Sequence, residues 1–218
     1  MSSAKTLEAK EKGQRTVSKR LRSFGHFALT ALAAGLFLTT LMFRDAPVAK
    51  AHIMPSPCDF TTGGGFVITD SGNHANFGLV GGCKNGGYFG HVNFVDHDSV
   101  GIFAGLHVSS TSIDGYFEPA AGSNVRDICG TANTNLFGTV KFRARTVDNG
   151  EPGTADRFGL KLTGVSPPYT GASAVVVTTR TLGGGNIQLH KPNPSTTGPD
   201  TPPDEITACG SDDSGLGT

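Results

Sequence analysis

The stretch Val140-Lys141-Phe142-Arg143-Ala144-Arg145-Thr146 decides the fold, because its side chains alternate strictly between two kinds. The even positions carry apolar or small side chains, and the odd positions carry basic ones. Successive side chains of a β-strand point to opposite faces of the sheet, so this pattern predicts a strand with one face on the core and one face in water. Residues 157–162 show the same alternation after a turn-rich loop, which predicts the partner strand.

The rest of the chain after residue 51 has the composition of an all-β domain. It holds 28 of the 31 glycines, no tryptophan and no sustained repeat near 3.6 residues. Turn signals recur between short β-branched or aromatic runs, and Asn85-Gly86 is typical of a hairpin turn. We therefore expect an antiparallel sandwich or barrel of about nine or ten short strands. The expected strands are 63–69, 75–80, 88–95, 102–112, 112–117, 125–131, 140–146, 157–162, 169–182 and 186–190.

An export signal precedes this domain. Residues 27–43 are 17 uncharged, mostly apolar residues behind a basic leader, and Ala49 and Ala51 fit the small-residue preference of a signal peptidase. The sequence predicts that residues 1–51 are a signal peptide with a hydrophobic export helix, and that the mature chain starts at His52. An uncleaved anchor is the alternative, because a spanning helix needs roughly 20 apolar residues and this run is slightly shorter.

Removal of residues 1–51 changes the charge balance. The chain has 18 Lys+Arg and 18 Asp+Glu, and the leader holds nine of the basic and three of the acidic residues. Nine basic and fifteen acidic residues remain, so the net charge of the mature domain is −6. Such a domain is not expected to bind nucleic acid. The expected partner is an unknown extracellular protein or polysaccharide, with membrane contact only through an uncleaved N-terminal helix.

Four cysteines predict two disulfides in an exported chain. They are Cys58, Cys83, Cys129 and Cys209, which allow three pairings. Our working hypothesis joins Cys58 to Cys209, which would clamp the two ends together, and leaves Cys83 with Cys129. No Cys-x-x-Cys pair is present, so a zinc or redox site built on thiolates is not expected.

The composition changes abruptly after His190. Residues 191–218 are rich in Pro, Thr, Ser, Asp and Gly, with Ile206 and Leu216 as the sizeable apolar residues. Such a segment is expected to be disordered, although a disulfide at Cys209 would fasten it to the body. The predicted organisation is therefore a leader over 1–51, a β-domain over 52–190 and a disordered tail over 191–218.

The loop 148–153, with Asp156 just beyond it, is a candidate calcium site. Asp148, Asn149, Glu151 and Asp156 offer the oxygen ligands that hard cations prefer, although their spacing is not that of a helix-loop-helix calcium loop. The same carboxylates could serve a secreted hydrolase. In the structural alternative, Asp148 and Asn149 cap a turn, and Asp156 pairs with Arg157 or a neighbour.

Histidines suggest two further sites. His91, Asp96, His97 and Asp98 have the residue types of a metal or acid–base site, but His91 and His97 would lie about 20 Å apart on an extended strand. A turn in which Asp accepts backbone N–H bonds is the alternative. If the mature chain starts at His52, its α-amino group and imidazole can chelate copper together, and an accidental histidine at a flexible terminus is the alternative.

The basic side chains of residues 140–146 form a stripe on an acidic domain. Lys141, Arg143 and Arg145 could contact an anionic polymer. If the two strands are adjacent, the polar neighbours of this stripe are Asn186, Gln188 and His190. A solvated face that protects the sheet from edge pairing is the alternative.

Six short motifs occur in order between Cys58 and His190. They are TGGGFV at 62–67, ANFG at 75–78, GHVNFVDH at 90–97, ICGTA at 128–132, VDNGEPG at 147–153 and GGGNIQLH at 183–190. Together they resemble the post-COAP domain family of small secreted bacterial β-domains. The resemblance implies an extracellular module, often attached to larger surface proteins, without an established activity or catalytic residues. Cys83 stands where we expect a non-cysteine residue, so its disulfide is expected to be particular to this chain.

No assembled catalytic set marks this chain as an enzyme, and no Gly-x-Ser-x-Gly elbow is present. The leading hypothesis is a secreted, disulfide-stabilised β-domain that acts as a structural or interaction module and needs no cofactor. One alternative is a hydrolase that uses the carboxylates of the 148–156 loop. The other is a metal-binding protein, with calcium at that loop or copper at His52.

Overall fold

The computed structural model describes residues 51–101, 104–164 and 174–217. The predicted signal peptide and its export helix at 27–43 lie outside the described residues. Within the described ranges, no helix has both the length and the apolar character needed to cross a membrane.

The described part of the chain forms one antiparallel sheet, which confirms the all-β prediction. Its strands are β1 Phe60–Ile68, β2 His74–Lys84, β3 Gly87–Asp96, β4 His107–Phe117, β5 Val125–Thr134, β6 Gly138–Val147, β7 Arg157–Thr163, β8 Ala174–Thr181 and β9 Gly184–His190. The order in the sheet is β8-β7-β6-β5-β4-β3-β2-β1-β9. Strands β1 to β8 thus form a meander, and β9 returns to pair with β1. The two strands expected at 102–112 and 112–117 are a single strand, β4, with register shifts against β5.

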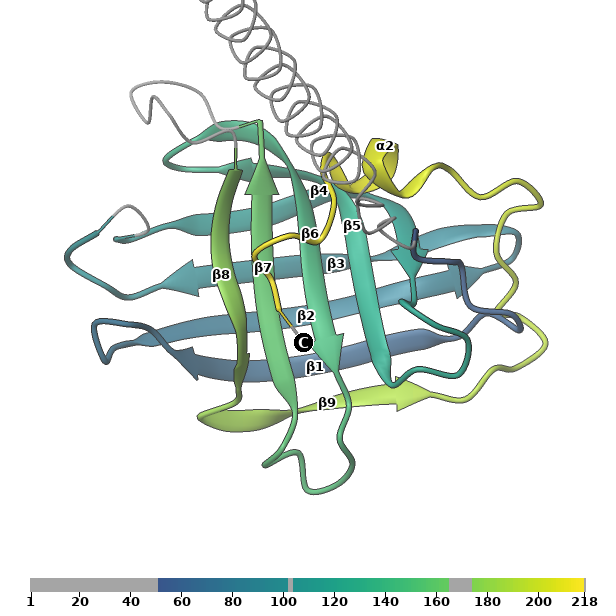
Figure 1. Cartoon of the computed structure of the whole chain (residues 1–218), viewed down its shortest axis with the longest axis horizontal. Helices are drawn as coiled ribbons and strands as arrows, with labels where there is room; N and C mark the ends of the chain where they lie inside the picture. Colours follow the sequence, from purple (N-terminus) through teal and green to yellow (C-terminus); the bar gives the residue numbers. More distant parts are fainter. Residues whose placement is uncertain (1–50, 102–103, 165–173, 218) are drawn as a thin grey trace, which may run out of the picture. The chain divides into compact units, whose positions relative to one another are not determined.

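The sheet curls into a half-barrel whose two halves enclose an apolar core. Figure 1 shows β5 to β8 running across β1, β2, β3 and β9. The ring of Phe158 on β7 stacks on Phe77 of β2 with centroids 4.1 Å apart, and it lies 6.1 Å from the ring of Phe94 on β3. A Cβ atom at Gly81 of β2 would lie 2.7 Å from Ile128 on β5, so glycine is required for this close approach.

The prediction from residues 140–146 is confirmed for the inner face of the strand. For the outer face, which we expected to be in water, it is wrong. Val140, Phe142 and Ala144 are buried in the core, as predicted. On the other face, however, Arg143 is 0% exposed and Arg145 is 2% exposed. A further layer of chain must therefore cover the face that we expected to be in water.

Residues 204–217 supply that layer, and residues 195 and 197 accept hydrogen bonds from the β2–β3 turn, so the prediction of a disordered tail is wrong for the described segment 191–217. It contains the short helix α2, Glu205–Cys209, which Asp204 caps at its N-terminus by accepting a hydrogen bond from the backbone N–H of Thr207. Gly210 ends the helix in the left-handed conformation, with φ of 80°. Leu216 is fully buried, and its carbonyl accepts a hydrogen bond from Thr179 of β8 over 2.7 Å. Polar composition predicted disorder because it lacks the signature of a core, but here the polar groups bind a charged surface.

The disulfides join Cys58 to Cys83 and Cys129 to Cys209, so the hypothesis of a Cys58–Cys209 clamp is wrong. Cys58 lies two residues before the start of β1, whose pairing with β2 brings it beside Cys83, with Cα atoms 5.9 Å apart. Cys129 lies one residue beyond the core residue Ile128 on β5, so it faces outward, where α2 brings Cys209 to a Cα distance of 4.7 Å. Both separations suit a disulfide. The second disulfide does fasten the C-terminal segment to the body.

Candidate functional site

The outer face of β5 and β6 carries a buried cluster of charged side chains. Asp127 on β5 lies directly opposite Arg145 on β6 in the ladder, so the register itself places a carboxylate beside a guanidinium. Arg145 donates from Nε to Asp127 Oδ1 and from Nη2 to Asp127 Oδ2, each over 2.8 Å. Arg143 Nη1 donates to the same Oδ2 over 2.7 Å. Two-pronged arginine contacts of this kind fix geometry as well as charge.

The C-terminal cover, which we define as residues 204–217, adds the remaining anions. Glu205 at the start of α2 accepts a short hydrogen bond from Arg143 Nη1, and Asp213 accepts one from Arg145 Nη2 over 2.8 Å. Backbone carbonyls of the cover also bind these cations: Ser211 O lies 2.7 Å from Arg143 Nη2, and Gly217 O lies 2.9 Å from Arg145 Nη1. The cover therefore meets the basic side chains with acceptors of both kinds.

Lys161 on β7 extends this contact to the next strand. Its ammonium group is 2.9 Å from Ser214 O, 3.0 Å from Asp212 O and 3.2 Å from the carboxylate of Asp212. Lys161 is buried as a result. Basic side chains on two adjacent strands are thus held under one segment of chain.

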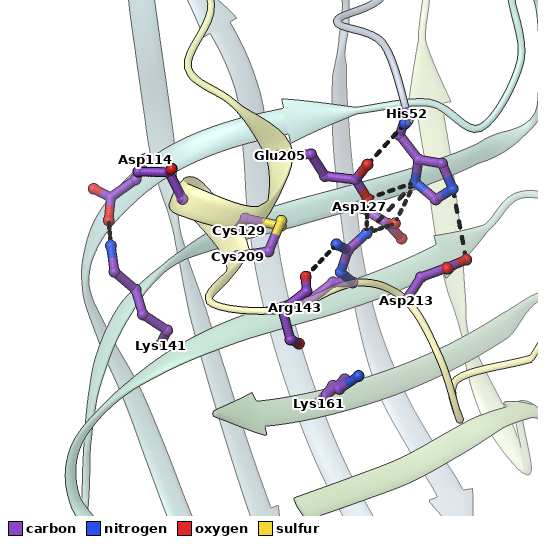
Figure 2. The surroundings of a disulfide bond; sticks show 12 residues. His52, Asp114, Asp127, Cys129, Lys141, Arg143, Lys161, Glu205, Cys209 and Asp213 are labelled. Carbon is purple, nitrogen blue, oxygen red and sulfur yellow. Dashed lines mark hydrogen bonds and ion pairs between the residues drawn. A yellow bond between two sulfur atoms is a disulfide. The ribbon is translucent and has the colours of Figure 1, made fainter. Parts of the chain in front are cut away.

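His52 reaches the same cluster from the other end of the domain. Its backbone N–H donates to Glu205 Oε2 over 2.8 Å, and its ring Nδ1 lies 3.0 Å from Asp127 Oδ2. Its Nε2 lies 3.5 Å from Asp213 Oδ2, and the side chain is 7% exposed. Figure 2 shows these groups pointing toward one another beside the Cys129–Cys209 disulfide. We call this set the His52 cluster; its members are His52, Asp127, Arg143, Arg145, Glu205 and Asp213.

The electrostatics of the His52 cluster favour the ionised forms of Asp127 and Arg145. Burial alone would raise the pKa of Asp127, but hydrogen bonds from Arg145 and His52 and the charges of both arginines outweigh it. The pKa of Asp127 is therefore held well below its usual range. Burial likewise would lower the pKa of Arg145, but its hydrogen bonds to Asp127 and Asp213 and the charges of these two carboxylates together outweigh burial and raise the pKa. A carboxylate whose pKa lies far below neutral pH is a weak general base, and it carries no proton to donate as a general acid.

Three members of the cluster also have the residue types of a metal site. Ligand atoms of His52, Asp127 and Glu205 all lie within 4.8 Å of one another. Arg143 Nη1, however, binds both carboxylates and lies 3.5 Å from His52 Nδ1. The guanidinium thus fills the position that a cation would take, and a metal ion would have to displace it. Copper at His52 stays a prediction that this arrangement does not favour.

The basic side chains of residues 140–146 do lie together on one face of β6. Their surroundings fit neither contact with an anionic polymer nor a solvated face. Arg143 and Arg145 are buried, and half-exposed Lys141 pairs with Asp114 over 2.8 Å. The polar residues expected beside the stripe lie on β9, which pairs with β1 and not with β6. Those residues are Asn186, Gln188 and His190.

The predicted calcium ligands lie in the β6–β7 loop, where their oxygens accept hydrogen bonds from the edge strand β9. Asp156 is fully buried, and its two oxygens accept from the backbone N–H groups of Asn149 and Ile187, each over 2.8 Å. Asp148 accepts from the N–H of Leu189 over 2.7 Å, and Glu151 accepts from the side-chain amide of Asn186 over 3.1 Å. Asp148 also accepts from the N–H of Gly150, which is the turn cap of the structural alternative, and the contacts to Ile187 and Leu189 fasten the free edge of β9. They give no support to calcium or to a hydrolase.

The histidine and aspartate cluster at the end of β3 matches the turn interpretation. Asp98 accepts hydrogen bonds from Ser71, Thr69 and Asn73, and the bond from Ser71 contributes most to lowering the pKa of Asp98. Asp96 is buried and accepts from the backbone N–H of Asp98 over 2.8 Å.

The two histidines of that predicted cluster have separate surroundings. His91 lies away from the turn, and its Nδ1 is 2.9 Å from the hydroxyl of Ser110 on β4. His97 lines a shallow polar hollow at the ends of β2 and β3. The other residues around this hollow are Gly72, Asn73, His74 and Asn76.

A second buried charged group was missed by sequence reasoning. Arg126 on β5 donates from Nη2 to Asp59 Oδ2 over 2.6 Å, and Tyr116 donates its hydroxyl to Asp59 Oδ1 over 2.7 Å. Glu118 lies 3.2 Å from Arg126 Nη1. Burial, followed by the charge of Asp59, raises the pKa of Tyr116 well above its usual value, so the phenol stays neutral. The available signal was that Arg126 shares the inward parity of Ile128 in a predicted strand, which requires a buried partner.

Comparison with known proteins identifies no relatives: no family model matches the chain, and neither the curated proteins nor the solved structures contain a significant match. The resemblance to post-COAP domains therefore stays a prediction.

Proposed function

We propose that this protein is a secreted, disulfide-stabilised β-domain that acts as a structural or interaction module outside the cell and not as a catalyst. The observation that carries this proposal is that the charged side chains of the His52 cluster bind one another. Its carboxylates and guanidinium groups are paired with one another beneath a cover that the Cys129–Cys209 disulfide holds in place. Side chains with the chemistry for catalysis or metal binding thus serve to hold chain segments together.

The pairing of the cysteines supports a location outside the cytoplasm. All four cysteines of the chain are paired, and disulfides of this kind persist in oxidising compartments. The predicted leader and the resemblance to post-COAP domains point the same way. Neither disulfide has the Cys-x-x-Cys spacing of a redox catalyst, which supports a stabilising role for both.

The described residues include a surface hollow where a partner could bind. The polar hollow around His74, Asn76 and His97 presents imidazole and amide groups, which hydrogen-bond to polar molecules such as polysaccharides or peptide backbones. The ring of His74 stacks on Phe66 with centroids 4.2 Å apart, which fixes its orientation. Fixed polar groups in a hollow suit an interaction module.

Export and thiol accounting test the proposal. The full chain is expressed in an exporting bacterial host, and free thiols are counted in the denatured protein without reductant. We expect a protein outside the cytoplasm with no free thiols. A Cys58→Ser/Cys83→Ser double variant is the matched control, because it should keep the other disulfide and also show none. A cytoplasmic protein with four free thiols contradicts the proposal.

A further inference from the structure

The His52 cluster has one more carboxylate than it has permanent cations. Its carboxylates are Asp127, Glu205 and Asp213, and its permanent cations are Arg143 and Arg145. The imidazole of His52 contacts all three carboxylates but is charged only when protonated. Asp213 is 42% exposed and is partly compensated by water, whereas Asp127 and Glu205 are buried, where charge interactions are screened least. One more positive group beside these two carboxylates would therefore balance the permanent charges of the cluster.

The backbone nitrogen of residue 52 already lies where that group is needed. As an amide it donates one hydrogen bond, to Glu205 Oε2 over 2.8 Å. An ammonium group at the same atom would keep this contact, bring a full positive charge to the carboxylate and provide further donors.

Among the described residues, backbone pairing begins immediately after this nitrogen. Ile53 and Glu118 exchange two backbone hydrogen bonds of 2.9 Å and 2.7 Å, which fix the position of His52. Ala51, in contrast, is exposed to solvent. The boundary between exposed and anchored chain thus coincides with the cleavage position that the small residues Ala49 and Ala51 predict.

We infer that hydrolysis of the Ala51–His52 peptide bond creates an α-ammonium group that forms a buried ion pair with Glu205 and completes the His52 cluster. The oxygen of a water molecule bonds to the carbonyl carbon of Ala51, which becomes a carboxylate. The C–N bond breaks, and the nitrogen of His52 keeps that electron pair and takes up both protons of the water. A leader peptidase of the export route supplies the catalysis. The cleavage step rests on the proposed secretion of the protein. The ion pair itself can be tested on purified protein without export.

The ion pair also accounts for the presence of Glu205 at the start of a five-residue helix under the cover. Glu205 connects the new N-terminus to Arg143, and four residues further on Cys209 is linked to β5. Processing would thereby lock the first residue of the mature chain to its C-terminal cover. The precursor, in which the nitrogen is an amide, would have the same fold with a weaker contact.

A thermodynamic cycle tests this ion pair. Two forms of the domain are prepared, one starting at His52 and one keeping Ala51, each with Glu205 and with Glu205→Gln. Because Ala51 is exposed, the extra residue adds no steric conflict. With Glu205 present, we expect the extended form to melt about 4 °C or more below the form that starts at His52. With Glu205→Gln, the same extension should shift the melting temperature by less than about 1 °C.

The control variant is Glu151→Gln, which removes an exposed glutamate outside the cluster and should leave the effect of the extension unchanged. Equal melting temperatures for the two forms with Glu205 would overturn the ion pair. A copper ion bound by the form that starts at His52 would also overturn it, because a metal-bound amine cannot carry the proton. The mass of the exported protein tests the processing step separately: a first residue other than His52 overturns that step and leaves the result of the cycle standing.

Discussion

The two faces of strand β6 are both dry, but for different physical reasons. On the inner face, Phe142 and its apolar neighbours are removed from water by packing against other apolar groups. On the outer face, Arg143 and Arg145 are removed from water by a segment of chain that, together with Asp127 on β5, provides an acceptor for nearly every donor nitrogen. Apolar burial depends on volume and area, whereas ionic burial depends on specific partners in a specific register.

This difference shows how a polar stretch of sequence becomes part of a fold. The C-terminal cover has only two large aliphatic residues, Ile206 and Leu216, and Ile206 is exposed, so the cover cannot dock by hydrophobic burial alone. It docks because its carboxylates and carbonyls match the cations on β6 and β7, and because a disulfide keeps it close. The predictions below test how far the two faces really differ.

The largest expected effect lies on the inner face. Replacing Phe142 with alanine removes a fully buried ring and leaves a cavity, so the free energy of unfolding should fall by about 3–5 kcal/mol. Chemical denaturation measures this loss. Phe142→Leu is the control and should cost less than about 1.5 kcal/mol, since it keeps most of the volume. A small effect of Phe142→Ala would mean that this face is not tightly packed.

The corresponding test of the outer face is Asp127→Asn, which should lower the free energy of unfolding by about 3 kcal/mol at pH 7 because it leaves buried arginines undercompensated. The folded-state pKa of Asp127 lies below its unfolded value, so the stabilisation is complete above about pH 4 and is lost as the pH falls toward the folded-state pKa. The difference between wild type and variant should therefore shrink below about pH 4. A difference that stays constant down to pH 2 would contradict this assignment.

Asp156→Ala tests the structural role of the β6–β7 loop against the calcium hypothesis. The variant leaves the backbone N–H groups of Asn149 and Ile187 without their acceptor, so unfolding should become easier by about 1–3 kcal/mol. The melting temperature of the wild type should not respond to added calcium or to a chelator. A rise with calcium that Asp156→Ala abolishes would restore the metal interpretation.

The two disulfides should differ by a smaller amount in their contribution to the free energy of unfolding. Cys129–Cys209 closes 80 residues and Cys58–Cys83 closes 25. The chain-entropy model therefore predicts that removing the longer link costs about 1 kcal/mol more. Paired serine variants, compared by chemical denaturation, measure the difference. The reverse order would show that the cover holds to the outer face without its covalent link.

The smallest effect is expected at the uncovered end of the basic stripe. Lys141 pairs with Asp114, but 38% of its side chain is exposed. Lys141→Ala should change the free energy of unfolding by less than about 1 kcal/mol, as is usual for solvated ion pairs. A loss of free energy as large as that of Asp127→Asn would show that solvent exposure does not set how much an ion pair on this face contributes to stability.

The sequence predicted those features of the fold that depend on local backbone geometry. Alternation places Phe142 inward and Arg143 outward whatever the rest of the chain does, so the strand and its faces could be read directly. The prediction that Arg143 is solvated failed, because its partners Asp127 and Glu205 lie 16 and 62 residues away. No local pattern encodes such a pairing.

Two signals in the sequence did point toward the cover. Cys209 lies in a segment with no apparent core, which implied a covalent attachment, and acidic residues flank it at Glu205, Asp212 and Asp213. An acidic segment with a cysteine is a natural complement to a basic strand with a cysteine on its neighbour. The pairing of the disulfides could not be predicted, because it depends on which face of β5 Cys129 occupies relative to a helix that the composition did not suggest.

Hydrogen–deuterium exchange over residues 204–217 in the oxidised protein tests the central claim most directly. The cover predicts protection of the amides of Ala208, Gly210 and Leu216, and of Thr179 on β8, because each donates a backbone hydrogen bond. These amides should exchange at least about 100-fold more slowly than in an unstructured peptide. Exchange at the unstructured rate throughout 204–217, with Thr179 equally unprotected, would contradict the account.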